Sequence, residues 1–104
     1  MMNVRCATLA QAELAETRKW LNQQQPELGK DLNEEVRQVA ARIERMPFLF
    51  PLEQADVRKC RLTRAPYIIR FVIRDAAVFV IAFSHQHRDP DSWGESDNQH
   101  INFF

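Results

Sequence analysis

The chain has 104 residues, carries no net formal charge, and is 45% hydrophobic. This length suits one domain with a modest core. The two glycines exclude a glycine-rich phosphate-binding loop, and no apolar run approaches the ~20 residues that span a membrane. The segment MMNVRCATLAQAEL lacks the long apolar stretch of a secretory signal. We therefore expect a single domain over residues 1–104, soluble and located in the cytoplasm.

The first predicted elements are a short strand and a helix. Residues 3–7 have the alternation of a strand. A helix is predicted from Thr8 to about Gln24, and Thr8 with Gln11 has the spacing of a capping box. The side chains that we expect on the inner face of this helix are Ala10, Leu14, Thr17 and Leu21, with Trp20 beside them.

A second helix is predicted to begin at Pro26, which suits a first helical turn because its missing N–H is not needed there. Pro47 ends the helix. A connection of two or three residues makes the two helices an antiparallel hairpin. Apolar residues follow Pro26 at helical spacing: Leu28, Leu32, Val36, Val39, Ala40, Ile43 and Met46.

Three more strands are predicted over residues 57–64, 67–75 and 77–85, with a tight turn at Asp75–Ala76. Residues 77–85 are apolar on both faces, as in a central strand. The predicted fold is α+β in the order β-α-α-β-β-β, with the helical hairpin packed on one face of a mainly antiparallel four-stranded sheet. We expect the opposite face to be more open and to carry arginines. The order of the strands in the sheet stays undetermined.

The segment FLFPLEQAD, residues 48–56, is predicted to be a connecting loop. Its large apolar side chains, Phe48, Leu49 and Phe50, have two interpretations. They seal the helix pair onto the sheet, or they form a patch that binds a partner.

Charge is unevenly distributed along the chain. Residues 57–88 carry seven basic and one acidic side chain, whereas residues 89–104 carry four acidic side chains and none that is basic. This asymmetry favours a basic surface that meets an anionic partner, and the acidic tail 89–104 could cover it. The alternative is an ordinary solvated face of the sheet.

The stretch HQHRDPDSW, residues 85–93, invites a metal interpretation because His85 and His87 point the same way on a strand. A metal site needs further ligands. The residues that could supply them have no spacing that is typical of a metal site: Asp89, Asp91 and His100. We expect no metal and no cofactor. Pro90 is instead predicted to end the strand, and Trp93 to fold back onto the core.

The same stretch also allows acid–base chemistry. A histidine titrates near neutral pH, and arginines bind phosphate and stabilise developing charge. The candidate catalytic residues of a nuclease are His85, Arg61 and Arg70. The candidate residues for binding the target or a phosphate are Arg58, Lys59, Arg64 and Arg88. The alternative is that these side chains are structural or solvated.

In combination, three segments resemble the RelE/ParE superfamily, the toxins of bacterial type II toxin–antitoxin modules of the plasmid stabilisation type. They are the helical segment that ends in ARIERMP, then VRKCRLTRAPYIIRFVI (57–73), then VFVIAFSHQHRDPDSW (78–93). The resemblance covers roughly residues 4–95. The residues that carry it are Arg58, Pro66, Tyr67, His85, Arg88, Asp89, Pro90 and Trp93.

The resemblance implies one of two activities. RelE-like toxins cut mRNA on the ribosome with basic residues of the sheet, whereas ParE-like toxins inhibit DNA gyrase by binding. This chain is neutral, and no tyrosine follows its last strand, so we favour a ParE-like toxin that is not an enzyme. A ribosome-dependent endoribonuclease is the alternative, and a non-toxic degenerate member is the second alternative.

The resemblance also implies a cognate antitoxin, which wraps the toxin and forms a hetero-oligomer with it. A helix of that partner would lay its apolar face in a groove lined by Phe48, Leu49 and Phe50 or by the helical hairpin, and the sequence leaves the choice open. Its acidic side chains would meet the basic region 57–88.

Overall fold

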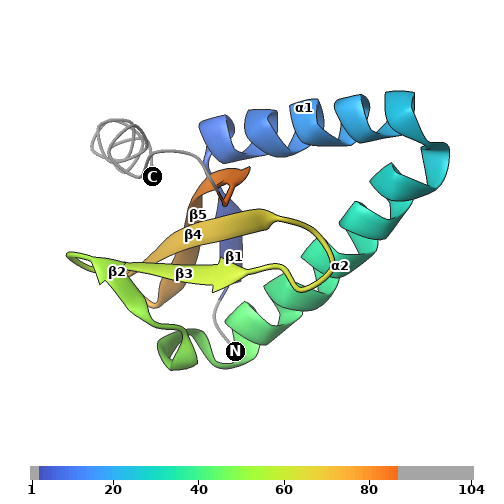
Figure 1. The fold of residues 1–104 in the computed structure, drawn as a ribbon. Coiled ribbons are helices and arrows are strands. Elements are labelled where there is room, and N and C mark those ends of the chain that lie inside the picture. Colours follow the sequence, from blue (N-terminus) through green and yellow to red (C-terminus); the bar gives the residue numbers. More distant parts are fainter. Residues whose placement is uncertain (1–2, 87–104) are drawn as a thin grey trace.

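The computed structural model describes residues 3–86, which form a helical hairpin on a single sheet (Figure 1). The elements in chain order are β1 (Asn3–Cys6), α1 (Thr8–Gln24), α2 (Pro26–Arg45), the short 3-10 helix η1 (Pro47–Leu49), β2 (Leu52–Gln54), β3 (Val57–Arg61), β4 (Tyr67–Arg74) and β5 (Ala77–His85). The sheet has five strands in the order β1-β5-β4-β3-β2. Strand β1 is parallel to β5, and the other neighbours are antiparallel. The predicted α+β class and element order are confirmed.

The fifth strand is a correction to the four-stranded prediction. Strand β2 lies inside the segment that was predicted to be a loop, and it pairs with β3 through an irregular register between Leu52 and Gln54. An alternation of three residues is too short to be distinguished from a loop by pattern alone. Strand β2 lies at the edge of the sheet, where β3 is its neighbour.

The predicted capping box at the start of α1 is wrong. The N-cap is Ala7, and no side chain caps the helix. Ala7 continues the pairing of β1, since its N–H donates to the carbonyl of Val80 at 2.8 Å. The side chain of Gln11 donates to the carbonyl of Cys6 at 3.1 Å instead. The end of β1 therefore fixes the start of the helix, and Thr8 becomes its first residue.

Helix α2 begins at Pro26 as predicted, with Glu27 in its first turn and two arginines in its last turn. Only Gln25 connects the helices, which is shorter than the expected connection. The hairpin is tight near this end, because a Cβ at Gly29 would lie 2.0 Å from Oδ1 of Asn22. The glycine thus lets the two helices approach closely.

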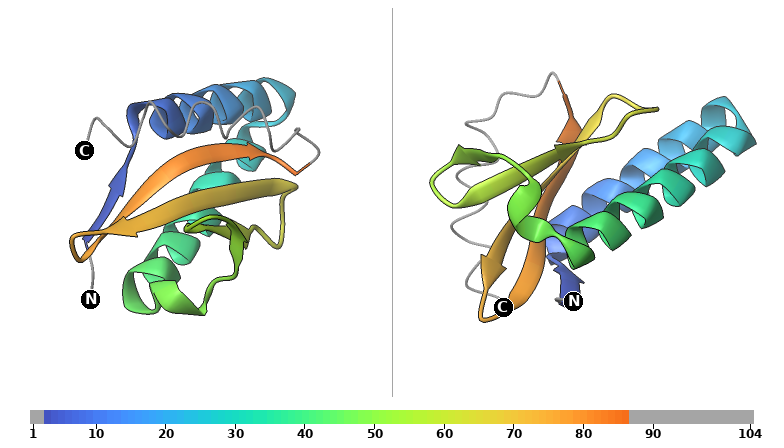
Figure 2. Two further views of the ribbon diagram at one scale, coloured as in Figure 1. Left: turned by 90° about the vertical axis from the view of Figure 1, so that its left-hand side faces the viewer. Right: turned by 90° about the horizontal axis from the view of Figure 1, so that it is seen from below.

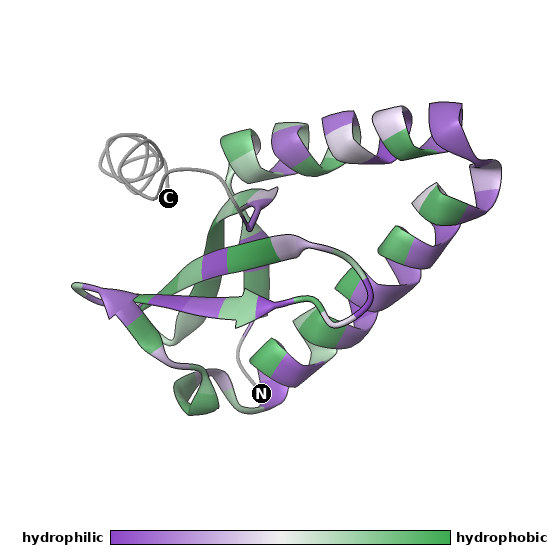
Figure 3. Ribbon diagram, in the orientation of Figure 1, coloured by the Kyte–Doolittle hydropathy of each residue, from purple (hydrophilic) through white to green (hydrophobic). Residues whose placement is uncertain are grey.

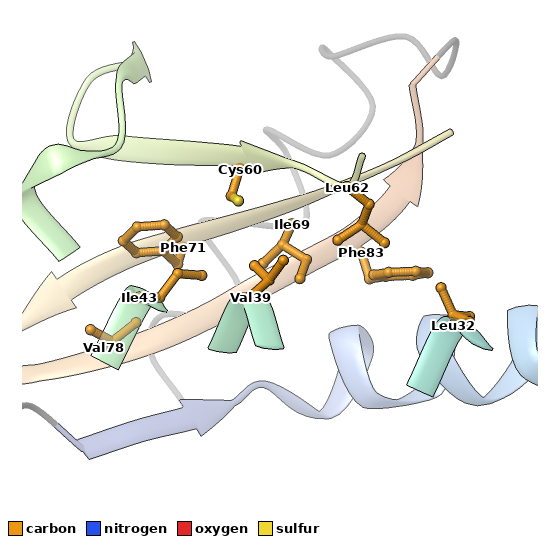
Figure 4. Packing of buried hydrophobic residues seen from close by; sticks show 9 residues of the cluster. All are labelled: Leu32, Val39, Ile43, Cys60, Leu62, Ile69, Phe71, Val78 and Phe83. Atoms are coloured by element: carbon orange, nitrogen blue, oxygen red, sulfur yellow. The ribbon is translucent and has the colours of Figure 1, made fainter. Parts of the chain in front are cut away.

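Both helices cover the same face of the sheet (Figure 2). The hydrophobic segments of α2 lie mainly on its side toward the sheet (Figure 3). Figure 4 shows the resulting core, in which Leu32, Val39 and Ile43 of α2 meet side chains of the sheet: Cys60, Leu62, Ile69, Phe71, Val78 and Phe83. Fully burying each large side chain of this kind contributes roughly 1.5–3 kcal/mol.

The face away from the helices has its own buried cluster: Val57, Val72, Phe79, Ile81 and Ala82. The pairing of β4 with β5 shifts between Arg70 and Phe71, and Ile81 is the extra residue of this bulge. The bulge lets Ile81 and Ala82 join the same cluster. The expectation of an open face is therefore wrong for its centre, since Val72 is fully buried.

The predicted turn between β4 and β5 is confirmed. Asp75 and Ala76 both have positive φ angles, 52° and 61°. Two consecutive left-handed residues are typical of a type I′ hairpin turn, although glycine usually occupies the second position. Within residues 3–86, no helix has the length and apolarity needed to cross a membrane.

Candidate functional site

Arg70 lies in a charged cluster on the face of the sheet away from the helices. Its side chain is 4% exposed and forms two hydrogen bonds with Glu53, from Nε to Oε1 at 2.6 Å and from Nη2 to Oε2 at 3.2 Å. Nη1 donates to Oγ of Ser84 at 2.9 Å. Lys59 also lies near Glu53, with 3.5 Å between Nζ and Oε2. Arg70 therefore ties the central strand β4 to the edge strand β2.

The hydrogen bond from Arg70 lowers the pKa of Glu53 below its ordinary value of 4.5, although burial opposes the shift. The charges of Arg70 and Lys59 act in the same direction. Glu53 is thus ionised near neutral pH, and its charge offsets one of the positive charges on this face. A phosphate approaching Arg70 would have to compete with this carboxylate.

His85 lies at the end of β5 on the helix side. Its ring contacts Tyr67 edge to face, with 5.6 Å between centroids, and Tyr67 stacks on Phe83 at 5.2 Å. Burial raises the pKa of Tyr67. Arg61 alternates with the buried Cys60 and so shares the face of Arg70. The structure therefore does not bring the three predicted catalytic residues together, because His85 lies on the face opposite the two arginines.

Arg58, a predicted target- or phosphate-binding residue, holds the segment that follows α2. Nη1 donates to the carbonyl of Phe50 at 2.7 Å and to that of Phe48 at 3.3 Å. Its guanidinium carbon also lies 5.3 Å from the centre of the Phe48 ring. These contacts hold the backbone of the segment, in which Phe48 and Leu49 are exposed.

An exposed apolar surface follows the end of α2. It consists of four large side chains, which are 50%, 62%, 73% and 56% exposed: Met46, Phe48, Leu49 and Leu52. We call it the apolar surface 46–52. Next to it is a hollow of about 530 Å³, which Arg45 and Ala76 help to line. Met46, Phe48 and Leu49 line this hollow together, which makes the surface a candidate interaction site.

Phe50 behaves differently from its two neighbours in sequence. Its ring packs edge to face on the buried Phe71, with 5.7 Å between centroids, and Arg42 lies 5.5 Å from its centre. The interpretation that the segment 48–50 seals the core is therefore confirmed for Phe50, and the partner-binding interpretation stays a prediction. Phe50 seals the core, whereas Phe48 and Leu49 are available to a partner.

Glu35 is a site residue that the sequence interpretation missed. It is 4% exposed, and its Oε2 accepts hydrogen bonds from the Thr63 amide at 2.5 Å, the Thr63 hydroxyl at 2.8 Å and the Arg64 amide at 3.0 Å. Burial would raise the pKa of Glu35, but these hydrogen bonds and the charge of Arg64 outweigh it, so the pKa is lowered. The signal was a carboxylate on the apolar stripe of α2, between Leu32 and Val39.

Glu35 fixes the loop between β3 and β4, and this brings Arg64 and His85 to one place. Both line a pocket at the tip of the helical hairpin, together with Trp20 and Tyr67. Trp20 is 54% exposed, so it is not part of the packed inner face of α1. Among the predicted binding residues within residues 3–86, Arg64 lines this pocket together with His85. Arg58 instead contacts the Phe50 carbonyl, and Lys59 lies near Glu53.

Several predicted features lie outside the described residues 3–86. They are Arg88, the strand end at Pro90, the fold-back of Trp93, the acidic tail 89–104, and the other metal candidates His87, Asp89, Asp91 and His100. Among residues 3–86, no group of three His, Cys, Asp or Glu side chains is placed to hold a metal ion.

A helical hairpin on one face of this sheet, joined to the Pro-Tyr strand β4 and the His-terminated strand β5, is the fold of a RelE/ParE superfamily toxin. A family model described as "ParE toxin of type II toxin-antitoxin system, parDE" matches residues 4–90. The chain therefore belongs to the ParE toxin family, and it is a ParE-like toxin of a type II toxin–antitoxin module.

A solved structure, described as the chromosomal ParDE TA system from P. aeruginosa, is similar in fold. The TM-score is 0.71 at 17% sequence identity, and the match covers 82% of this chain and 96% of the other. No curated protein matches the sequence significantly. The resemblance to the superfamily, expected over roughly residues 4–95, is confirmed, as is the preference for the ParE branch.

Proposed function

We propose that this toxin inhibits DNA gyrase by binding it in the cytoplasm, without catalysing a reaction. The observation that carries the proposal is the separation of the candidate nuclease residues. Arg70 is buried in its ion pair with Glu53, and His85 lies on the other face of the sheet. General acid–base cleavage needs its groups around one reacting atom. Inhibition by binding does not require these side chains to lie around one atom.

We further propose that the apolar surface 46–52 binds the cognate antitoxin. Its exposed side chains suit the apolar face of a partner helix. Arg45 and Arg58 beside it supply positive charge for acidic side chains on that helix. Phe48 and Leu49 would be the anchors, and Phe50 would support them from the core.

The test is expression of the wild-type chain without antitoxin, compared with His85→Ala and Arg61→Ala variants. We expect growth arrest with a DNA-damage response for all three chains and no codon-linked cuts in mRNA. In vitro, the purified chain should inhibit supercoiling by gyrase. Mapped mRNA cuts that disappear in the variants would instead show a ribosome-dependent nuclease. Normal growth with the wild-type chain would show a degenerate member without toxicity.

A further inference from the structure

A cavity of about 190 Å³ lies between the helical hairpin and the sheet. Residues of β1, α1, α2, β4 and β5 line it. Its innermost lining residues are at most 4% exposed: Ala10, Ile43, Ile69 and Phe83. The cavity shares no lining residue with the pocket of Arg64 and His85 or with the hollow beside the apolar surface 46–52. It is therefore a separate, interior site.

The arrangement of the two helices explains where this cavity lies. The helices approach closely at Gly29 and diverge toward β1 (Figure 1). At the wide end, three of the residues that line the cavity are small: Cys6 of β1, Ala10 of α1 and Ala40 of α2. Protein interiors are packed densely, with few spaces larger than a water molecule. Small residues at the point where the helices are far apart leave such a space.

The walls of the cavity are uncharged. Arg5 lines it, but strand alternation turns this side chain to the other face of the sheet, where its guanidinium carbon lies 6.0 Å from the centre of the Phe79 ring. Burial raises the pKa of the Cys6 thiol, and the charge of Glu13 adds to the shift, so the thiol is neutral near neutral pH. The carboxylate of Glu13 accepts a hydrogen bond from the Phe83 amide at 3.0 Å. An ion or a strongly polar ligand would therefore lose its hydrogen bonds with water and gain few in return.

The size and chemistry of the cavity match a small hydrocarbon-like molecule. A buried water needs two to four polar partners, whereas a cavity of roughly 150 Å³ lined by Leu, Ile and Phe stays dry and binds benzene. The present cavity is slightly larger, and side chains of the same kinds line it: Leu14, Ile43 and Phe83. A segment of a partner chain is a poorer match, because its backbone N–H and C=O groups would be buried without hydrogen bonds.

We propose that this cavity binds one small, uncharged, apolar molecule of about the size of a benzene ring. The bound molecule contacts α1, α2 and β1 at the end where the helices diverge, and it stabilises the folded chain. The site is additional to the proposed gyrase and antitoxin interactions, and its occupancy depends on neither.

The experiment titrates the full chain with benzene and follows the methyl resonances of Val36 and Ile43 by NMR, with thermal unfolding in parallel. We expect saturable shifts and a melting temperature that rises with benzene concentration, because a ligand that binds only the folded state stabilises it. Phenol has the same ring and one hydroxyl group, which finds no partner in the cavity. We expect it to bind about tenfold more weakly than benzene.

Variants of two neighbouring alanines of α2 locate the binding. Ala40→Leu fills the cavity and should abolish the benzene shifts, and the smaller change Ala40→Val should weaken binding with less strain on the core. Ala41→Leu and Ala41→Val make the same changes at an exposed position of the same helix, and they should bind benzene like the wild type. Circular dichroism checks that each variant folds. The absence of saturable shifts with benzene in the wild type, equal binding of phenol and benzene, or wild-type binding by the folded Ala40 variants would overturn the proposal.

Discussion

Arg70 and Glu53 form a doubly hydrogen-bonded ion pair in which the arginine is 4% exposed. Removing one partner of such a pair leaves the other charge buried, which typically costs ~3–5 kcal/mol. We therefore predict that Glu53→Ala lowers the free energy of unfolding by about 3 kcal/mol. Denaturant unfolding followed by circular dichroism measures this change. The loss should be largest for β2, because Glu53 is its tie to β4.

The exposed pair of Arg37 with Glu34 is the matched control. Their side chains are 76% and 45% exposed, and solvent screens a pair of this kind. Glu34→Ala should change stability by no more than about 0.5 kcal/mol. Equal losses in the two variants would contradict the structural role assigned to Arg70.

A second prediction concerns the stability of the fold at acidic pH. Glu35 and Glu53 both have a folded-state pKa below the ordinary value of 4.5. Carboxylates with a lowered pKa stabilise the fold above that value, and they lose this contribution as pH falls through the folded-state pKa. The free energy of unfolding of the wild type should thus be level near neutral pH and fall below about pH 4.5.

Glu35→Gln separates the contribution of one carboxylate. It should be less stable than the wild type near neutral pH and show a shallower loss below pH 4.5, because its amide does not titrate there. Thermal unfolding at a series of pH values provides the measurement. A variant as steep as the wild type would mean that Glu35 is not ionised in the folded protein.

The sequence predicted the long elements of this fold because their patterns are strong. Pro26 and Pro47 bracket α2, and the apolar face of that helix has a clear period. Strand β2 was missed because a strand of three residues is too short to show an alternation of apolar and polar side chains. Its position depends on the contact between Glu53 and Arg70. That contact joins residues 17 apart in the chain.

The candidate site was harder to predict, because the faces of the sheet decide which side chains meet. His85 and Arg70 are both chemically suited to phosphate chemistry, yet strand alternation places them on opposite faces. Glu35 lies on the apolar stripe of α2, but its position in the sequence does not identify its partners. Only the tertiary position of the loop at Thr63 shows why a carboxylate is buried there.

A third prediction uses the turn between β4 and β5. Ala76 has a φ angle of 61°, which costs an L-residue with a side chain about 1–2 kcal/mol. Ala76→Gly relieves this strain at the cost of more freedom in the unfolded chain, so we expect a net stabilisation of about 0.5–1 kcal/mol. Ala77→Gly, in the adjacent strand, is the control and should destabilise by a similar amount. Denaturant midpoints of the two variants should therefore move in opposite directions.

The fourth prediction tests the apolar surface 46–52. Phe48 and Leu49 are 62% and 73% exposed, so the double variant Phe48→Ala/Leu49→Ala should fold with nearly wild-type stability. If these side chains anchor the antitoxin helix, their loss should weaken antitoxin binding by ~30-fold or more, since an interface anchor contributes ~2 kcal/mol or more. Isothermal titration with the purified antitoxin gives this value, and Arg37→Ala on the outer face of α2 is the control. In cells the double variant should stay toxic when the antitoxin is co-expressed, because the toxin is no longer captured. Wild-type affinity in the double variant would place the antitoxin elsewhere on the toxin.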